Sequence, residues 1–194
     1  MNKQTILQGH LDAPLNEEGE RQAQVAAEHL RDIKFDAIFS SDLLRAARTA
    51  EIIKLERDLA VQTSRLLRER FYGPYEGQPS AQYFEAARSL LEQYKELPRE
   101  QRWKMKVHDQ VESNEELVGR FTTFLREIAA THLGRKVLVV SHGGVIRTFL
   151  VHIGWATEAE LPAGTFANGA YVELRADGVD FFVQDVYGVT KQIL

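Results

Sequence analysis

The stretch Lys136-Val-Leu-Val-Val-Ser-His-Gly-Gly144 decides the fold class of this 194-residue chain. Its unbroken run of Val and Leu is typical of a short strand buried on both faces, as strands are in a parallel sheet covered by helices. Two glycines end the strand, and the sequence from 145 to 153 returns with helical spacing. A buried strand that passes directly into a helix predicts an α/β domain with helices on both sides of the sheet.

The same alternation continues on either side of this stretch. Asn16 is a good N-cap for a helix over 17–32, and Ser41 or Asp42 is expected to cap a second helix that ends near 57. Further helices are expected over 80–96 and 114–132, with a charged loop at 98–109 between them, and strands over 35–39, 61–66, 170–175 and 179–187. The last two flank a hairpin turn at 176–178. This order predicts a single domain over residues 1–194, a three-layer α/β/α sandwich with a mainly parallel sheet.

The composition excludes several classes of protein. The net charge is −4, so no basic field favours nucleic acid or an anionic membrane as a partner. The chain has no cysteine, which excludes disulfides, thiolate catalysis and Cys-ligated zinc. The first thirty residues hold no apolar run of signal-peptide length, and no stretch approaches the roughly 20 apolar residues of a membrane span. We therefore expect a cytoplasmic protein, while its oligomeric state is not encoded in any pattern we recognise.

A candidate ligand site follows the buried strand. Ligands of open α/β sheets bind beyond the carboxyl ends of the strands, where His142 is followed by Gly143 and Gly144. Glycines let a ligand approach the backbone closely, and a helix N-terminus favours an anion. A lone histidine is more often structural, but this position at a strand end favours a functional role.

Two more segments carry ionisable side chains to the same region. Arg45 lies near the start of the second helix, where a guanidinium can bind two phosphate oxygens, although a solvated surface arginine is the commoner case. Arg48, one turn later, suits that plain interpretation better. Glu69 lies in a loop dense in Arg, Tyr and Gly, and a carboxyl held near phosphate would suit a general acid. Taken alone, it could equally belong to a surface cluster.

Together these segments resemble the histidine phosphatase superfamily, whose members are phosphoglycerate-mutase-like. The matching segments are Thr5–Gly9, Asp12–Gly19, Ser40–Ala50, Leu67–Gly77 and Ser141–Gly144, with weaker signals at Glu112-Ser113, Glu116-Leu117 and Asn168. They occur in the family's order and span nearly the whole chain. The length and Leu67–Gly73 look more like the small phosphatase branch, including fructose-bisphosphatase-like members, than the longer mutases.

The resemblance implies a role for each matching residue. His142 looks like the second active-site histidine, Arg45 like the phosphate-clamping arginine, and Glu69 like the acid that protonates the leaving alcohol and then activates water. The remaining positions resemble phosphate- or substrate-binding residues: Asn2, Gln8, Gly9, Tyr72 and Gly143. The resemblance implies a small phosphorylated substrate of undetermined identity and no metal or organic cofactor.

One part of the family pattern is missing. The family signature is Arg-His-Gly-Glu-Thr, two variable residues and Asn, and Asn2 matches its last position. The nucleophilic histidine and the first central strand would then precede Met1, so we expect that the sequence starts late, at an internal Met. That strand would bury about five apolar side chains, whose burial is worth roughly 7–15 kcal/mol. A 194-residue product should therefore be marginally stable or unfolded, and inactive on p-nitrophenyl phosphate.

Three alternatives bear on this interpretation. His10 could replace the nucleophile only if it reached the strand end, from which it is several residues away. The protein could instead be a non-catalytic pseudophosphatase that binds phosphorylated ligands or partners. An α/β-hydrolase is suggested by His-Gly-Gly, but no Gly-x-Ser-x-Gly segment occurs.

Overall fold

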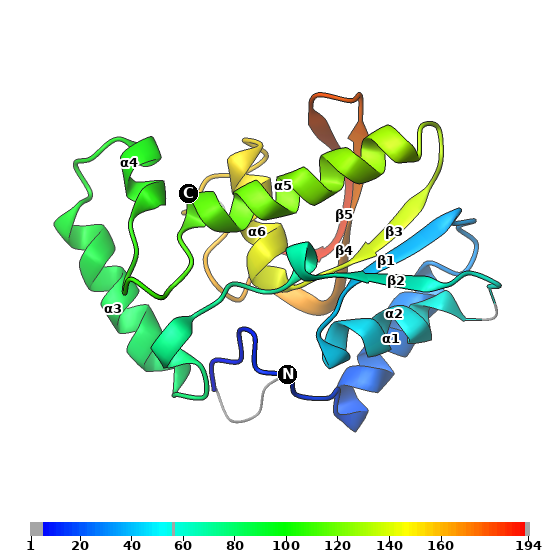
Figure 1. Ribbon diagram of the computed structural model, residues 1–194, viewed down its shortest axis with the longest axis horizontal. Coiled ribbons are helices and arrows are strands. Elements are labelled where there is room, and N and C mark those ends of the chain that lie inside the picture. Colours follow the sequence, from blue (N-terminus) through cyan, green and yellow to red (C-terminus); the bar gives the residue numbers. More distant parts are fainter. Residues whose placement is uncertain (1–5, 56, 193–194) are drawn as a thin grey trace.

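The fold is a three-layer α/β/α sandwich, seen in a computed structural model that describes residues 6–55 and 57–192 (Figure 1). The helices are α1 Glu17–His29, α2 Leu44–Lys54, α3 Ser80–Gln93, α4 Arg99–Lys104, α5 Asn114–Thr131 and α6 Gly143–His152, with short 3-10 turns η1 Arg65–Leu67 and η2 Gly73–Tyr75. The strands are β1 Ala37–Ser41, β2 Val61–Ser64, β3 Val137–Val140, β4 Phe166–Ala176 and β5 Phe181–Val189. The predicted fold class is confirmed.

The described strands form two sheets. In the first, β1 lies between β2 and β3 and is parallel to both, with Phe39 opposite Gln62 on one side and Val139 on the other. The second sheet is the antiparallel hairpin β4–β5. The predicted turn joins these two strands, and the Asp177 carboxylate accepts hydrogen bonds from the two amides that follow Gly178.

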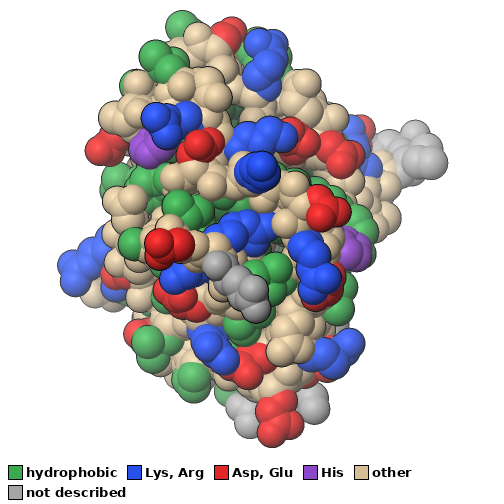
Figure 2. Space-filling view, turned by 90° about the vertical axis from the view of Figure 1, so that its right-hand side faces the viewer, with side chains coloured by type: hydrophobic (Ala, Val, Ile, Leu, Met, Phe, Trp, Pro, Cys, Tyr) green, Lys and Arg blue, Asp and Glu red, His purple; other side chains and the backbone are tan. Residues whose placement is uncertain are grey.

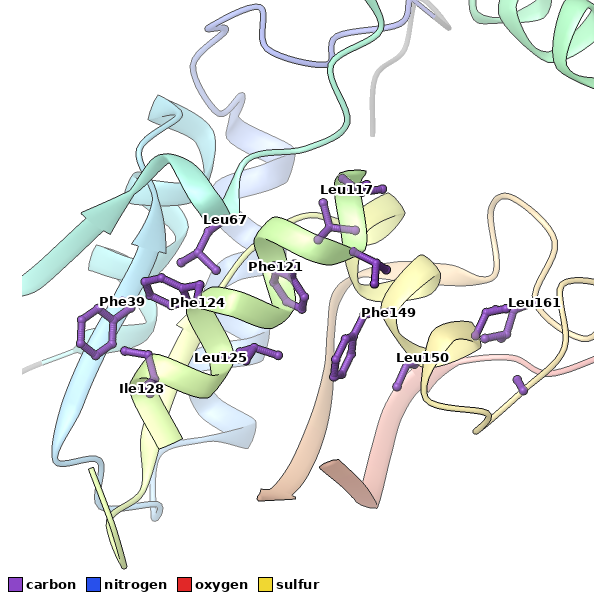
Figure 3. Close-up of a cluster of buried hydrophobic side chains, with 14 of the residues drawn as sticks. Phe39, Leu67, Leu117, Phe121, Phe124, Leu125, Ile128, Phe149, Leu150 and Leu161 are labelled. Carbon is purple, nitrogen blue, oxygen red and sulfur yellow. The ribbon is translucent and has the colours of Figure 1, made fainter. Parts of the chain in front are cut away.

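Helices cover both faces of the parallel sheet because alternate side chains of its strands point to opposite sides. On one face, Leu138 packs against the buried side chains of α1 and α2. On the other face, Val137 and Val139 pack against a larger cluster. That cluster is built mainly by α5 and α6, with Phe121 in contact with Phe149, and it extends to Phe39 of β1 (Figure 3).

Local sequence signals set several helix ends. Asn16 caps α1 by accepting a hydrogen bond from the Gly19 amide at 2.8 Å, as predicted. Ser113 and Glu116 form a reciprocal capping box at the start of α5. The helix ends lie one to three residues inside the predicted ones, apart from α6, which begins at Gly143 rather than 145.

The predicted cap of α2 is wrong. Asp42 is paired instead with Arg68 through two hydrogen bonds of 2.7 Å, and Ser41 is buried within β1. The acceptor at the start of α2 is the Asp12 carboxylate, which binds the Leu44 amide at 2.7 Å from 32 residues away.

Two other expectations need correction. Residues 99–104, placed in a charged loop by the sequence, form the short helix α4, because Trp103 is buried and anchors the segment. In β3, Val140 is buried, but Val137, Leu138 and Val139 are only half-buried. The reason is that this strand is paired along one edge and borders a cavity along the other.

No helix within residues 6–55 and 57–192 combines the length and the apolar character needed to span a bilayer.

Candidate functional site

The segments singled out from the sequence meet at one edge of the parallel sheet. Because β1, β2 and β3 are parallel, their carboxyl ends lie at the same edge. Arg45 follows β1, Glu69 follows β2 and η1, and His142 follows β3. The Ser141 hydroxyl fixes two of these ends together by donating to the Leu67 carbonyl at 2.8 Å.

His142 is a buried imidazole that borders a cavity. Its side chain is 9% exposed, and its Nε2 is buried without a hydrogen-bond partner among the described residues. Burial, reinforced by the positive charges of Arg45 and Arg120, holds the pKa of His142 well below its usual value. Such a group costs free energy unless something binds it, and a ligand oxygen is a suitable partner.

This lowered pKa predicts a pH-dependent stability. Between the folded and unfolded pKa values the unfolded chain binds more protons, so stability is lost as the pH falls below about 6.5. One proton changes the free energy of unfolding by at most about 1.4 kcal/mol per pH unit. Urea unfolding at pH 7.5 and 5.5 measures this effect. Between these pH values the free energy of unfolding should fall less in His142→Gln than in the wild type. His108→Gln, a change at an exposed position, is the control. The prediction would be contradicted if the free energy of unfolding fell as much in His142→Gln as in the wild type.

The Arg45 side chain connects α2 to the loop that precedes α1. Its guanidinium donates to the Gly9 carbonyl at 2.7 Å and to the Leu11 carbonyl at 2.9 Å. Burial lowers the pKa of Arg45, while the charge of Glu69 acts in the opposite direction. The guanidinium is thus held near both His142 and Glu69, where an anion would compensate its desolvation.

The Glu69 carboxylate lies at the N-terminus of α6. It accepts hydrogen bonds from the Arg70 amide at 2.8 Å and the Gly144 amide at 3.1 Å. The carboxylate therefore binds the backbone two residues after His142, at a helix end that favours negative charge. The contact is close, since a Cβ added to Gly144 would lie 2.6 Å from Glu69 Oε1.

Tyr72, Gln8 and Gly9 form a wall of the same cavity. Burial, followed by the charge of Glu69, raises the pKa of the Tyr72 hydroxyl, so this phenol stays protonated and can donate. Gly9 adopts φ +52°, and an added Cβ would lie 2.1 Å from an Oε1 atom of Glu76. Glycine is therefore required here, because Glu76 accepts hydrogen bonds from both the His10 and Tyr72 amides.

The other predicted positions divide between the surface and the cavity. Arg48 pairs with Glu20 on the exposed surface at 2.7 Å, in keeping with its plain interpretation. Gly143, the first residue of α6, and Asn168, whose side chain donates to Gln22 of α1, both line the cavity. Asn2 lies outside the described residues.

The site opens into a cavity of about 1240 Å³. Its rim carries His142, Arg45, Glu69 and Tyr72, and its interior is bordered by β3 and β4. Acidic and basic side chains are interspersed around a central hollow on the face seen in Figure 2, and hydrophobic side chains are visible within the hollow. No single sign of charge dominates that face.

Comparison with known proteins identifies the family. The model of the histidine phosphatase superfamily (branch 1) matches residues 1–187. The chain belongs to this superfamily. The resemblance recognised from the sequence motifs is thereby confirmed.

Relatives of the chain include "phosphoglycerate mutase-like protein 4" of Arabidopsis thaliana, 41% identical over 76% of the chain and 63% of the relative. "Uncharacterized phosphatase PhoE" of Bacillus subtilis is 36% identical over 78% of the chain and 70% of the relative. A solved mycobacterial glucosyl-3-phosphoglycerate phosphatase superposes with a TM-score of 0.76 at 26% identity, covering 98% of the chain and 93% of that structure. The match to the plant relative therefore spans less than two thirds of that protein.

The sequence alone did not indicate which side chain holds the Glu69 loop in place. Arg120 of α5 pairs with Glu112 at 2.6 Å and also donates to the backbone carbonyls of Leu66 and Glu69 at 2.7 and 2.9 Å. In addition to these two hydrogen bonds from Arg120 to the loop backbone, His10 contacts the loop, with its Nε2 2.8 Å from the Glu69 carbonyl oxygen. One feature of the sequence could have indicated this role. Arg120 lies next to the buried apolar residues of α5, and a charge in such a position needs a partner.

Proposed function

We propose that this histidine phosphatase hydrolyses phosphomonoesters through a phosphohistidine, and that the nucleophilic histidine comes from a segment outside the 194 residues. The observation that carries the proposal is the buried Nε2 of His142, which has no hydrogen-bond partner among the described residues and lies beside Arg45 and Glu69. A phosphoryl group bound there would give the imidazole Nε2 a hydrogen-bond partner and would offset the buried positive charge of the Arg45 guanidinium.

The chemistry follows from these positions. Arg45 and His142 bind the phosphoryl oxygens and stabilise the charge that develops on them in the transition state. The nucleophilic histidine forms a P–N bond as the P–O bond to the alcohol breaks, and Glu69 gives its proton to the departing oxygen. Glu69 then takes a proton from water, whose oxygen attacks phosphorus, breaks the P–N bond and releases phosphate.

The substrate we propose is a small phosphorylated metabolite. Relatives carry the names fructose-2,6-bisphosphatase and glucosyl-3-phosphoglycerate phosphatase, which describe such substrates for those proteins. Beyond the phosphoryl position the wall includes Tyr72, whose ring packs edge-on against Tyr83 with ring centroids 4.8 Å apart. Tyrosines combine an apolar face with a polar hydroxyl, which suits polyhydroxylated organic groups. A cytoplasmic location is part of this proposal.

Hydrolysis of p-nitrophenyl phosphate tests the proposal. We expect no turnover from the chain alone and clear turnover from a protein extended upstream of Met1 by its own coding sequence. In the extended protein, His142→Ala should lower kcat/KM at least a hundredfold, because it removes transition-state stabilisation. Arg48→Ala, an exposed change, is the control and should keep full activity. Turnover unaffected by His142→Ala would contradict the proposal.

A pseudophosphatase is the second candidate, because the described site offers no free nucleophile. Of the chain's six histidines, His142 is the proposed phosphate ligand and the Nε2 of His10 is taken by the Glu69 carbonyl. Calorimetric titration of the chain with inorganic phosphate and a sugar phosphate distinguishes the two. Tight binding by a protein that stays inactive after upstream extension would favour this candidate, and activity on extension would exclude it.

A further inference from the structure

A second, smaller pocket lies at the end of α6 that is farther from the proposed catalytic site. Its volume is about 380 Å³, and it is bordered by α5, by the end of α6 and by the tip of the β4–β5 hairpin. Helix α6 begins next to His142 at the rim and reaches this pocket at His152, after a rise of about 15 Å. The pocket is therefore separate from the catalytic rim, although Phe181 borders both it and the large cavity.

The hydroxyl of Thr122 distinguishes this pocket from an ordinary surface hollow. The Thr122 side chain is 8% exposed, and its Oγ1 is buried without a hydrogen-bond partner among the described residues. A threonine in a helix commonly donates to the carbonyl four residues earlier. The other threonines in the described helices do so at 2.8 Å: Thr49, Thr123, Thr131 and Thr148. Thr122 borders the pocket instead, so a group bound there is the partner that its hydroxyl lacks.

The helix side of the pocket is positively charged. Arg126 and His152 border it, and neither side chain has a hydrogen-bond or ion-pair partner within residues 6–55 and 57–192. Arg99 stacks on Trp103 and donates to the Val151 carbonyl at 2.8 Å, and it has no carboxylate partner in the described part of the chain. Partial burial, followed by the charges of Arg99 and Arg126, lowers the pKa of His152. Both guanidinium groups therefore act at the imidazole, where they would attract an anion.

The hairpin side of the pocket is mainly apolar. Val179 and Phe181 face it from the hairpin, and Ile153 faces it from the end of α6. The Phe181 ring is anchored in the core by an edge-on contact with Phe149, with ring centroids 5.5 Å apart, so this wall is fixed. Asp180 is exposed and is the one acidic residue among those described around the pocket. Its charge disfavours a ligand with a second negative group.

We infer that this pocket binds a small organic carboxylate with an apolar body. The carboxylate accepts hydrogen bonds from the Thr122 hydroxyl and the Arg126 guanidinium, and the body lies against Ile153 and Phe181. The pocket volume falls within the roughly 300–1,000 Å³ of small-molecule sites. This inference does not rest on the proposed function, because none of these residues belongs to the catalytic rim.

A pair of matched compounds tests the ligand class. The probe is 3-phenylpropionate, and its uncharged amide, 3-phenylpropanamide, is the control of the same shape. NMR titration of the upstream-extended protein, with inorganic phosphate present to occupy the proposed catalytic site, should shift the amide signals of residues 122, 126, 152 and 179–182. The amide should bind at least about tenfold more weakly, because its hydrogen bonds are not charge-assisted. The pKa of His152 should rise in the 3-phenylpropionate complex, because the bound anion favours the charged imidazole.

Two variants test the residues that would hold the carboxylate. Thr122→Val should weaken binding about tenfold and raise the melting temperature of the ligand-free protein by about 2–4 °C, because valine has the same shape and no unpaired hydroxyl. Its control is Thr123→Val, whose exposed hydroxyl donates to the Gly119 carbonyl, and which should leave the affinity unchanged. Arg126→Gln should also weaken binding about tenfold, whereas Arg31→Gln, at an exposed position, should not.

Several results would overturn the carboxylate site. One is equal affinity for the acid and the amide, and another is an affinity unchanged in both Thr122→Val and Arg126→Gln. Displacement of 3-phenylpropionate by additional inorganic phosphate would show an unspecific anion site and exclude the apolar part of the inference. Shifts confined to the rim around His142 would place the compound in the catalytic site instead. A lower melting temperature of Thr122→Val would show that the hydroxyl is already paired within the fold.

Discussion

Arg120→Met should lower the free energy of unfolding by about 3–5 kcal/mol, the usual cost of breaking a buried ion pair. The pair with Glu112 is largely enclosed, since the two side chains are 16% and 14% exposed. Removing the arginine leaves a largely enclosed carboxylate without its cationic partner. The Leu66 carbonyl loses its side-chain donor, and the Glu69 carbonyl keeps only its contact with His10. Urea unfolding followed by circular dichroism measures the change.

An exposed pair provides the control. Arg31 binds Glu28 at 2.6 Å, but the two side chains are 60% and 56% exposed, so Arg31→Met should cost less than about 1 kcal/mol. The double replacement Arg120→Met with Glu112→Leu should recover part of the loss, because no unpaired charge stays buried. A cost for Arg120→Met no greater than that for Arg31→Met would show that the pair does not hold the loop.

The fold could be predicted because its signals are local. The Val-Leu-Val-Val run and the glycines after it specify a strand that turns into a helix, and both lie within nine residues. The Asn16 cap acts on an amide three residues away. Parallel strands then bring His142, Arg45 and Glu69 to one edge without further information, which is why three distant motifs could be assigned to one site.

The supports of the site could not be predicted because they join distant residues of ordinary type. The Asp12 carboxylate caps α2 across 32 positions, and Arg120 reaches the Glu69 carbonyl across 51. Acidic and basic residues make up 27% of the chain, and nothing local marks these among them. The half-exposure of Val137 to Val139 was likewise missed, since burial of a strand depends on what lies along its second edge.

Gly144→Ala should lower kcat for an alkyl phosphate by about 10²–10³ in the upstream-extended protein, with little change in KM. The new Cβ would lie 2.6 Å from Glu69 Oε1 and 2.9 Å from Oε2, so the carboxylate must move. That movement breaks the hydrogen bond from the Gly144 amide and takes the acid away from the leaving oxygen. General acid catalysis is typically worth 10²–10⁴, while the proposed phosphate ligands Arg45 and His142 stay in place.

The fold should not suffer from this change. Gly144 lies in the first turn of α6 without a positive φ, and alanine is a better helix former there by up to about 1 kcal/mol. Gly119→Ala in α5, where an added Cβ meets no atom within 4 Å, is the matched control. Unfolding experiments should find both variants about as stable as the wild type, so a selective loss of kcat in Gly144→Ala would be a local effect at Glu69.

The choice of substrate decides whether the lost function is proton donation. p-Nitrophenolate leaves readily without a proton, whereas an alkoxide does not, so Gly144→Ala should impair an alkyl phosphate far more than p-nitrophenyl phosphate. Glu69→Gln should show the same pattern, and the double variant should be no worse than either single one, because both changes remove one group. Because Glu69 also activates water in the second step, which both substrates share, the comparison must use the rate of phosphohistidine formation in a single turnover. Equal losses of that rate on both substrates would mean that the displaced carboxylate positions the phosphoryl group and does not protonate the leaving oxygen.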